Sequence, residues 1–350
     1  MNHEIKIGKR FINENSGAYI IAEMSGNHNM DYERAVKIVK AAAEAGADAI
    51  KLQTYTADTI TLDSDAPCFQ ITQGTLWDGT TLHKLYEEAY TPWDWQPKLK
   101  ELAESLGLDC FSSPFDFTSV DFLEKMDVPA YKIASFEITD IPLIKKVAST
   151  GKPVIISTGI ASVEDIELAL KTCKDAGNEN VILLKCCSAY PAPYEDINLE
   201  TMVDMAKKFD CTIGLSDHTM GSAVSVAAVA MGAKVIEKHL TLARADGGVD
   251  AAFSMEPQEF KEMVDNIRII EKARGKVTYD ITEKQEKQRE FARSLFIAAD
   301  IKAGEVLTPE NLRSVRPANG LHTKYYEELL GKKVVRDCKY GEPMSWDMVE

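Results

Sequence analysis

The 350-residue sequence has no long apolar run and comparatively little positive charge. No segment approaches the roughly 18 uninterrupted apolar residues that a transmembrane helix needs, so we do not expect a membrane protein. Lysine and arginine total 40 residues against 55 aspartates and glutamates, which gives a formal net charge of −15. Because nucleic acids and anionic membrane surfaces attract basic proteins, this balance argues against both as partners. The first residues also lack an apolar core followed by a cleavage site, so no secretion signal is expected.

The sequence contains no C-x-x-C spacing, and its seven cysteines are odd in number. Four of them, Cys110, Cys186, Cys187 and Cys211, lie in or beside apolar segments. Unpaired cysteines in such positions are typical of buried free thiols in a reducing compartment. We therefore expect a cytoplasmic protein without a disulfide framework.

Eight short apolar segments, each ending in polar or ionisable residues, run along most of the chain. They begin at Ala18, Ala49, Asp109, Tyr131, Pro153, Val181, Thr212 and Val235. Most are separated by about a dozen residues with a helical pattern, and strands that alternate with helices eight times are typical of a (β/α)₈ TIM barrel. We predict an α/β barrel over residues 1–276, with a small hairpin at its start that plugs the barrel floor. The active site of such a barrel lies at the carboxyl ends of its strands.

One connection, residues 56–97, is much longer than the others and rich in aromatic residues. Its aromatic side chains include Phe69, Trp77, Tyr86, Tyr90, Trp93 and Trp95. Because it leaves the carboxyl end of the second strand, we expect a lid or a substrate-specificity element over the barrel mouth. A packed surface excursion or an oligomer contact is the alternative.

The pattern changes after the last helix of the barrel. A charged linker is predicted over residues 277–290, and a second domain of short strands, turns and small helices over residues 291–350. Within that domain, Thr308, Pro309 and Glu310 form a typical helix start.

His218 and His239 end the seventh and eighth predicted strands, which are neighbours in a closed barrel. Side chains alternate along a strand, so Ser216 shares a face with His218 and Glu237 with His239. Two imidazoles at the same height can bind one divalent metal ion and leave positions for substrate and water. A hydrogen-bonded structural role is the alternative for each histidine taken alone.

Lysines occur on the even-numbered strands, which contribute to one interior layer. Lys51 and Lys132 could face each other beside the hydroxyls of Ser113, Ser135 and Ser157, forming a cradle for a phosphate or carboxylate. Lys238 should point outward if His239 points inward, and the orientation of Lys185 stays open. A Schiff-base aldolase is the competing hypothesis for such lysines, although it would not need the histidine pair.

Eight short motifs carry a resemblance to a known family. They are AEMSGNHN from Ala22, KLQTY from Lys51, FSSPFD from Phe111, YKIASFE from Tyr131, STG from Ser157, SAYPAP from Ser188, GLSDHT from Gly214 and EKHLT from Glu237. In this order they resemble the sialic acid synthase family, and the tail from Phe291, with RPANG at Arg316, resembles its antifreeze-like (SAF) domain. The tracts AEMSGNHN, LWDGTTLHKLYEEAYTPWDWQ and GGVDAAFSMEP are similar to the pseudaminic acid synthase branch.

The resemblance implies an enzyme that condenses phosphoenolpyruvate with an open-chain amino sugar to give a nine-carbon keto acid and phosphate. In the pseudaminic branch the sugar is 2,4-diacetamido-2,4,6-trideoxy-L-altrose, and Trp77 and Trp93 are candidates to face its methyl and acetamide groups. N-acetylneuraminate and legionaminate synthases, which share the chemistry, are the alternatives.

The resemblance also assigns roles to residues of this sequence. His218 and His239 would hold Mn²⁺, with Mg²⁺ or Co²⁺ as alternatives, while Glu23 and Glu137 would flank the reacting carbons and Glu23 would handle the attacking water. Residues that match the phosphoenolpyruvate-binding set are Lys51, Ser113, Lys132, Ser135, Ser157 and Ser216. Residues that match sugar contacts are Gln53, Tyr190 and Asp250. Arg316 would reach the site of the partner subunit in a domain-swapped homodimer.

Two further hypotheses come from other functional classes. The tail could mark an ice-binding protein, and the barrel could be a non-catalytic scaffold that binds anions. The full set of polar side chains at the predicted strand ends argues against the ice-binding protein, and the scaffold stays as the remaining alternative.

Overall fold

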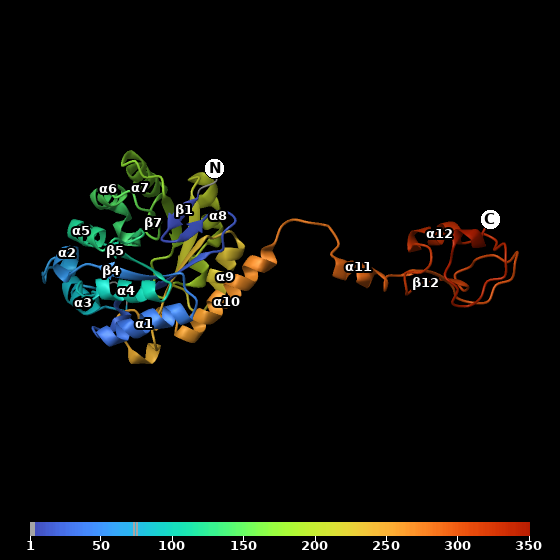
Figure 1. Cartoon of the computed structure of the whole chain (residues 1–350), viewed down its shortest axis with the longest axis horizontal. Helices are drawn as coiled ribbons and strands as arrows, with labels where there is room; N and C mark the ends of the chain where they lie inside the picture. The colour runs from blue at the N-terminus through green and yellow to red at the C-terminus, as the bar shows by residue number, and fades with distance from the viewer. Residues whose placement is uncertain (1–3, 73, 75) are drawn as a thin grey trace. The chain divides into compact units, whose positions relative to one another are not determined.

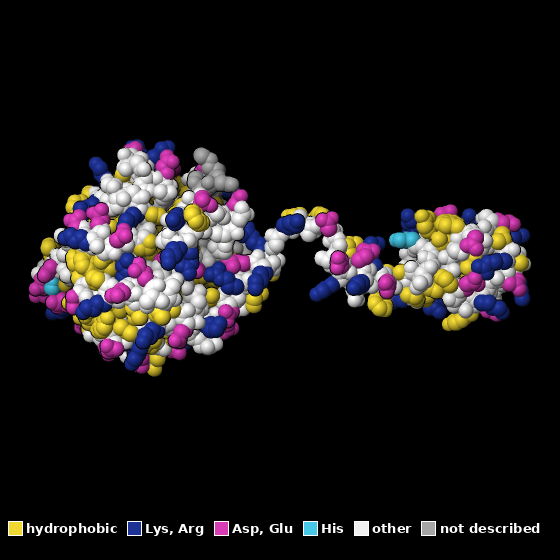
Figure 2. Space-filling view, in the orientation of Figure 1, with side chains coloured by type: hydrophobic (Ala, Val, Ile, Leu, Met, Phe, Trp, Pro, Cys, Tyr) yellow, Lys and Arg dark blue, Asp and Glu magenta, His cyan; other side chains and the backbone are white. Residues whose placement is uncertain are grey.

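The computed structural model describes residues 4–72, 74 and 76–350. It divides into two compact units, Met1–Gly275 and Lys276–Glu350 (Figure 1). Among the described residues, no helix is both long and apolar enough to span a bilayer. On the face that Figure 2 shows, side chains of both charges are interspersed over each unit rather than gathered by sign.

The first unit is the predicted TIM barrel. Eight parallel strands close into a ring in the order β10-β3-β4-β5-β6-β7-β8-β9, and β9 pairs with β10. The strands are β3 (Tyr19–Glu23), β4 (Ala49–Thr54), β5 (Asp109–Pro114), β6 (Tyr131–Ile133), β7 (Val154–Ser157), β8 (Val181–Cys186), β9 (Thr212–Asp217) and β10 (Val235–His239). Most of their side chains are buried on both faces, which is why the sequence shows continuous apolar runs rather than alternation.

Helices surround the ring and are capped where the sequence offers capping residues. The main ones are α1 (Tyr32–Glu44), α4 (Gln96–Ser105), α5 (Phe117–Lys125), α6 (Ile141–Ala148), α7 (Val163–Asp175), α8 (Leu199–Lys208), α9 (Ala223–Ala230) and α10 (Pro257–Arg274). Asp31 caps α1 by accepting from the backbone of Glu33 and Arg34, and Ser162 forms a capping box with Asp165 at the start of α7.

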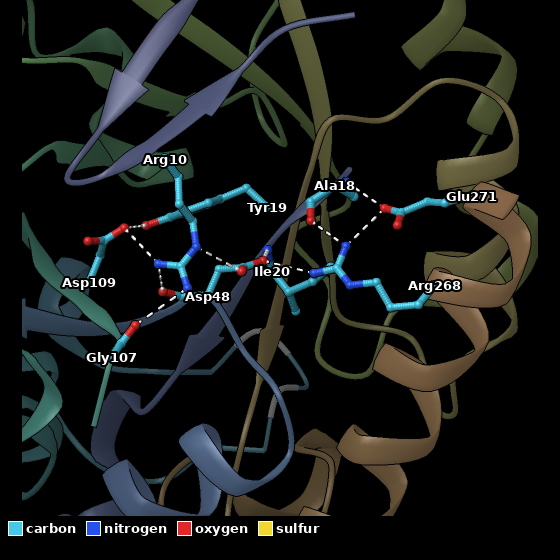
Figure 3. A network of polar contacts seen from close by, with 9 residues as sticks. All are labelled: Arg10, Ala18, Tyr19, Ile20, Asp48, Gly107, Asp109, Arg268 and Glu271. Atoms are coloured by element: carbon cyan, nitrogen blue, oxygen red, sulfur yellow. Dashed lines mark hydrogen bonds and ion pairs between the residues drawn. The ribbon is translucent and has the colours of Figure 1, made fainter. Parts of the chain in front are cut away.

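The predicted hairpin, β1 (Ile5–Ile7) and β2 (Arg10–Ile12), lies at the amino-terminal end of the barrel. Ile5, Ile7 and Ile12 are buried in the barrel core. Figure 3 shows how polar contacts attach this end: Arg10 pairs with Asp48 at 3.1 Å and with Asp109 at 3.4 Å. Both carboxylates lie where β4 and β5 begin, so the hairpin covers the barrel floor opposite the carboxyl ends of the strands.

The long connection after β4 is not a simple loop. It contains the short helix α2 (Ala57–Ile60) and the two-turn helix α3 (Leu82–Ala89), whose start is capped by Thr81. No helix is predicted from the sequence in this segment before α4. The apolar residues Leu82, Leu85 and Ala89 recur at helical spacing, and this pattern could have revealed α3.

The second unit has its own core. Its strands β11 (Ser294–Ile297) and β12 (Leu312–Val315) pair antiparallel, and α12 (Tyr326–Leu329) is a single turn. The core residues are Leu295, Ile297, Ile301, Leu307, Leu312, Leu329, Val334, Cys338, Met344 and Met348. Within the segment predicted as a charged linker, α11 (Glu283–Arg289) forms a short helix with no buried residue.

One local prediction in the second unit is wrong. Thr308, Pro309 and Glu310 do not start a helix, because the chain makes a single turn there and continues into β12. The turn is closed by the backbone bond from Leu312 N to the Thr308 carbonyl, 2.9 Å long. Pairing of β12 with β11 outweighs the local helix signal.

Candidate active site

A cavity of about 430 Å³ opens at the carboxyl ends of the barrel strands. Twelve of the residues predicted for the site line it. They are Glu23, Lys51, Gln53, Lys132, Ser135, Glu137, Ser157, Tyr190, Ser216, His218, His239 and Asp250. The barrel closure brings these residues together from seven strands or the loops that follow them.

Two lysines and two glutamates form a buried charge network in this cavity. The Lys51 ammonium lies 3.1 Å from Glu23 and 2.9 Å from Glu237, and Lys132 lies 4.0 Å from the same Glu237 oxygen. Lys132 also donates a 2.7 Å hydrogen bond to Ser157. Both ammonium groups therefore lie near one carboxylate oxygen, as expected for residues that belong to one barrel layer.

Burial shifts the pKa values of these groups in different directions. It raises the pKa of Glu23, with help from Glu237 and against the pull of Lys51, and it lowers the pKa of Lys132 to about 8. Burial would also raise the pKa of Glu237, but the two nearby lysines outweigh it and hold this pKa below its usual value. The pKa of Glu137 is raised to about 7 by burial, against the attraction of Lys132.

Serine hydroxyls also belong to this part of the barrel. Ser216 donates to Glu237 at 3.1 Å, and Ser188 donates to Ser135 at 2.8 Å. Ser113 is also buried on β5 but is not among the residues that line the cavity, and its hydroxyl has no hydrogen-bond partner among the described residues. Cationic and hydroxyl donors side by side suit a phosphate or carboxylate group.

The two histidines lie at the same height, because Lys238 of β10 pairs with Asp217 of β9 immediately before them. Their ring centroids are 5.3 Å apart. His218 places Nδ1 3.0 Å from the Cys187 carbonyl, which leaves its other nitrogen free to bind a ligand. His239 Nδ1 is buried and has no hydrogen-bond partner in the described structure.

These imidazoles fit a divalent cation on the chemistry of their free nitrogens. Burial, together with the neighbouring His218, holds the pKa of His239 well below its usual value, so this ring is neutral, as a metal ligand must be. In the described part of the chain, no group of three or more His, Cys, Asp or Glu side chains is arranged to hold a metal ion. Substrate and water would therefore have to complete a site built on two histidines.

Aromatic rings form another wall of the cavity. Tyr190 lies with its centroid 4.5 Å from His218, 5.1 Å from Phe253 and 5.6 Å from Trp77 of the long connection. Trp77 donates from its indole nitrogen to the Val249 carbonyl at 3.0 Å and lines the cavity.

Trp93 has a different position. It is not among the cavity-lining residues. Its ring packs against Phe122 of α5, with ring centroids 4.8 Å apart, and its indole nitrogen donates to the Tyr55 carbonyl. Of the two tryptophans considered as sugar contacts, only Trp77 faces the cavity.

The remaining candidate lysines and Arg316 lie elsewhere. Lys238 points away from the cavity and pairs with Asp217 at 2.9 Å, and Lys185 donates to the Cys186 carbonyl. Arg316 is exposed in the second unit, on the segment that follows β12.

Two cavity residues, Glu237 and Ser25, were missed as site residues by the sequence analysis. The alternation of side chains already placed Glu237 on the same face as His239, but it gave Glu237 no role in the site. Ser25 follows β3 and hydrogen-bonds to both Gln53 and Asp250. Only the folded chain brings those partners together.

Comparisons with known proteins agree with this architecture. The sequence model of the NeuB family matches residues 38–279, and that of the SAF domain matches residues 292–350. A pseudaminic acid synthase from Campylobacter jejuni subsp. jejuni serotype O:23/36 is 47% identical over 95% of this chain and 97% of its own length. A pseudaminic acid synthase from Helicobacter pylori is 46% identical over the same shares of the two chains.

A solved structure shows the same fold. The crystal structure of N-acetylneuraminic acid (sialic acid) synthetase from Leptospira borgpetersenii serovar Hardjo-bovis, in complex with citrate, superposes with a TM-score of 0.74. The two sequences are 32% identical, and the superposition covers 82% of this chain and 95% of the solved chain. From the barrel, its cavity and these matches together, we conclude that the chain belongs to the NeuB family and ends in a SAF domain.

Proposed function

We propose that this protein is a pseudaminic acid synthase. It condenses phosphoenolpyruvate with 2,4-diacetamido-2,4,6-trideoxy-L-altrose and releases a nonulosonic acid and phosphate, and it is therefore a transferase that forms a C–C bond. The observation that carries the proposal is the convergence of two buried lysines and two histidines on one cavity, in a chain of this family.

The lysines and serines suit phosphoenolpyruvate. This substrate carries a phosphate and a carboxylate, and the cavity of an otherwise acidic chain offers Lys51 and Lys132 as its cationic partners. Ser157, within 2.7 Å of the Lys132 ammonium, adds a hydroxyl at the same place. Fixed donors in a buried site stabilise developing negative charge more strongly than they would in water.

The two histidines are the proposed metal ligands. His218 and His239 would hold Mn²⁺, or Mg²⁺ or Co²⁺, which when bound would act as a Lewis acid on the sugar aldehyde.

Glu23 and Glu137 are the groups proposed to flank the reacting carbons, and Glu23 is the one proposed to handle the attacking water. A carboxyl whose pKa lies near 7, as that of Glu137 does, can both take and return a proton at neutral pH. Glu23 accepts a hydrogen bond from Gln53 and pairs with Lys51, so its carboxylate is held at the cavity wall where an attacking water could be oriented.

We also propose that the protein is a cytoplasmic homodimer in which Arg316 of the SAF domain reaches the partner's site. Large apolar side chains are exposed just after four successive barrel strands: Phe117, Phe136, Ile160 and Tyr194 are 50%, 57%, 48% and 60% exposed. Exposed apolar groups around a cavity mouth are typical of a surface that another chain covers. All seven cysteines have free thiols, which supports the cytoplasmic location.

The decisive experiment supplies the purified protein with phosphoenolpyruvate, Mn²⁺ and one amino sugar at a time, and measures phosphate and keto acid. We expect kcat/KM with the diacetamido altrose to be at least ~100-fold higher than with N-acetylmannosamine, which corresponds to a difference of about 2.7 kcal/mol in activation free energy. Comparable efficiency on N-acetylmannosamine, or a higher rate with the legionaminate-type sugar, would reject the pseudaminic assignment. Absence of keto acid with every sugar would reject the reaction itself.

A further inference from the structure

Ser25 has a backbone conformation that its residue type disfavours. Its φ of +47° lies in the left-handed region, where a Cβ atom is crowded by the backbone. Of the other non-glycine residues with positive φ in the described chain, four are asparagine or aspartate, which tolerate this region, and Met30 is 42% exposed. Ser25 is buried and lines the cavity. Glycine would adopt the same turn more easily, so the serine hydroxyl calls for an explanation.

The hydroxyl joins two elements of the cavity wall. It donates its single proton to Asp250, on the loop after β10, and accepts a 3.0 Å hydrogen bond from the Gln53 amide nitrogen at the end of β4. A hydroxyl has only one proton to donate, so toward Gln53 it can act only as an acceptor.

This polarity determines how the Gln53 amide is turned. Its nitrogen has two protons, and both are used: one goes to Ser25 and the other to Glu23 at 2.9 Å. The side-chain oxygen of Gln53, Oε1, has no hydrogen-bond partner among the described residues, and Gln53 lines the cavity. A flipped amide would place that oxygen against the Glu23 carboxylate and the Ser25 oxygen, which is repulsive.

We propose that Ser25 is a positioning residue for the amino-sugar subsite: by fixing the orientation of the Gln53 amide, it presents a hydrogen-bond acceptor to a hydroxyl or acetamide N–H of the sugar. The proposal rests on the proposed function and states that this part of the site accepts, and does not donate, a hydrogen bond from the sugar. An acceptor held by protein contacts discriminates strongly, because a substrate without the matching donor leaves it unpaired in a buried site.

The test measures separate KM values for phosphoenolpyruvate and the diacetamido sugar in Ser25→Ala, Gln53→Met and the double variant. Ser25→Ala should raise the sugar KM at least tenfold and leave the phosphoenolpyruvate KM within about twofold. If Ser25 acts through Gln53, adding Ser25→Ala to the Gln53→Met variant should raise the sugar KM by less than a further factor of about two. Equal changes in both KM values, or additive effects of the two substitutions, would overturn the proposal.

Two further variants keep the result interpretable. Ser25→Gly removes the same hydroxyl but relieves the backbone conformation, so it should fold and show the same rise in sugar KM; a wild-type sugar KM in this variant would reject the proposal. Ser254→Ala is the matched control, because this buried serine donates to the Asp250 backbone carbonyl instead of the carboxylate. A sugar KM raised as much by Ser254→Ala would mean that loop packing, and not the Gln53 amide, is responsible. Because the wild type is assayed first, failure of the proposed function is distinguished from failure of this inference.

Discussion

Glu237 is approached by both cavity lysines, and Lys51 also pairs with Glu23, so four charged groups lie together on almost fully buried side chains. Buried ion pairs seldom add net stability, because desolvation offsets their attraction. In the proposed function, the glutamates would hold the two lysine cations in fixed positions before an anionic substrate binds. The same burial leaves Glu137 with a raised pKa, and this has a measurable consequence for stability.

Replacing Glu137 by Gln should change the pH dependence of stability. The folded pKa of about 7 lies above the usual value of 4.5, so Glu137 is easiest to bury when protonated, and the fold loses stability as pH rises from about 4.5 to about 7. Between pH 5 and pH 8 the wild type should lose about 2–3 kcal/mol relative to Glu137→Gln, which keeps a neutral side chain. Denaturant unfolding of both proteins without substrate at the two pH values measures this difference. A constant difference would contradict the raised pKa.

Metal dependence is predicted for the two histidines. EDTA should abolish turnover, and Mn²⁺, Co²⁺ or Mg²⁺ should restore it. His239→Ala should retain the wild-type circular dichroism spectrum yet lose metal-dependent activity and bound metal, measured by elemental analysis. Full activity in a metal-free preparation would refute the assignment and favour a Schiff-base mechanism.

At the scale of elements, the connection between β4 and α4 divides into parts with different tasks. Trp77 contributes to the cavity wall beside Tyr190, whereas Trp93 packs outside the cavity against Phe122. The hairpin at the opposite end of the barrel has no side chain in the cavity and serves the core.

The two tryptophans should therefore separate specificity from stability. Trp77→Ala should lower kcat/KM for the diacetamido sugar at least tenfold and reduce its advantage over N-acetylmannosamine, since apolar surface is lost beside the substrate. Trp93→Ala should leave the preference unchanged but cost about 2 kcal/mol of stability through lost packing. Kinetics with both sugars and thermal unfolding of both variants check this. A preference that is unchanged in Trp77→Ala but reduced in Trp93→Ala would contradict this assignment.

Ile7→Ala tests the hairpin. Ile7 is fully buried at the barrel floor, so the cavity left by truncation should cost about 2–4 kcal/mol in unfolding free energy. KM values for both substrates should remain those of the wild type, because the active-site cavity lies at the other end of the strands. A marked change in either KM would indicate that the two ends of the barrel are coupled.

At the scale of the whole molecule, the barrel and the SAF domain are separate compact units, each with its own core. Of the candidate site residues, Arg316 alone belongs to the second unit. A role for it in catalysis depends on how chains assemble.

Subunit mixing tests that assembly. Arg316→Ala and His239→Ala chains should each be nearly inactive, and their mixture should recover partial activity, because some hybrid sites combine an intact barrel with an intact partner arginine. Exchange of differently tagged subunits must be verified by co-purification. Two variants that stay inactive after exchange would refute the contribution of Arg316 in trans.

Much of this protein could be predicted from local sequence patterns. Apolar runs separated by helical segments gave the barrel, since each strand must bury both faces. Strand alternation gave the common height of His218 and His239, and it also implied the inward face of Glu237. These inferences depend only on the periodicity of a strand and on the closure of the sheet.

Other features depended on contacts between distant segments, which only the tertiary structure decides. Thr308 enters a turn because β12 pairs with β11, and Trp93 turns toward α5 instead of the cavity. The hydrogen bonds of Ser25 join segments that are 28 and 225 residues away in sequence. The sequence by itself therefore determined the barrel and the residue types at its mouth. The orientation of the side chains followed from three-dimensional packing, because a hydrogen bond or ring contact forms only once both partners are in place.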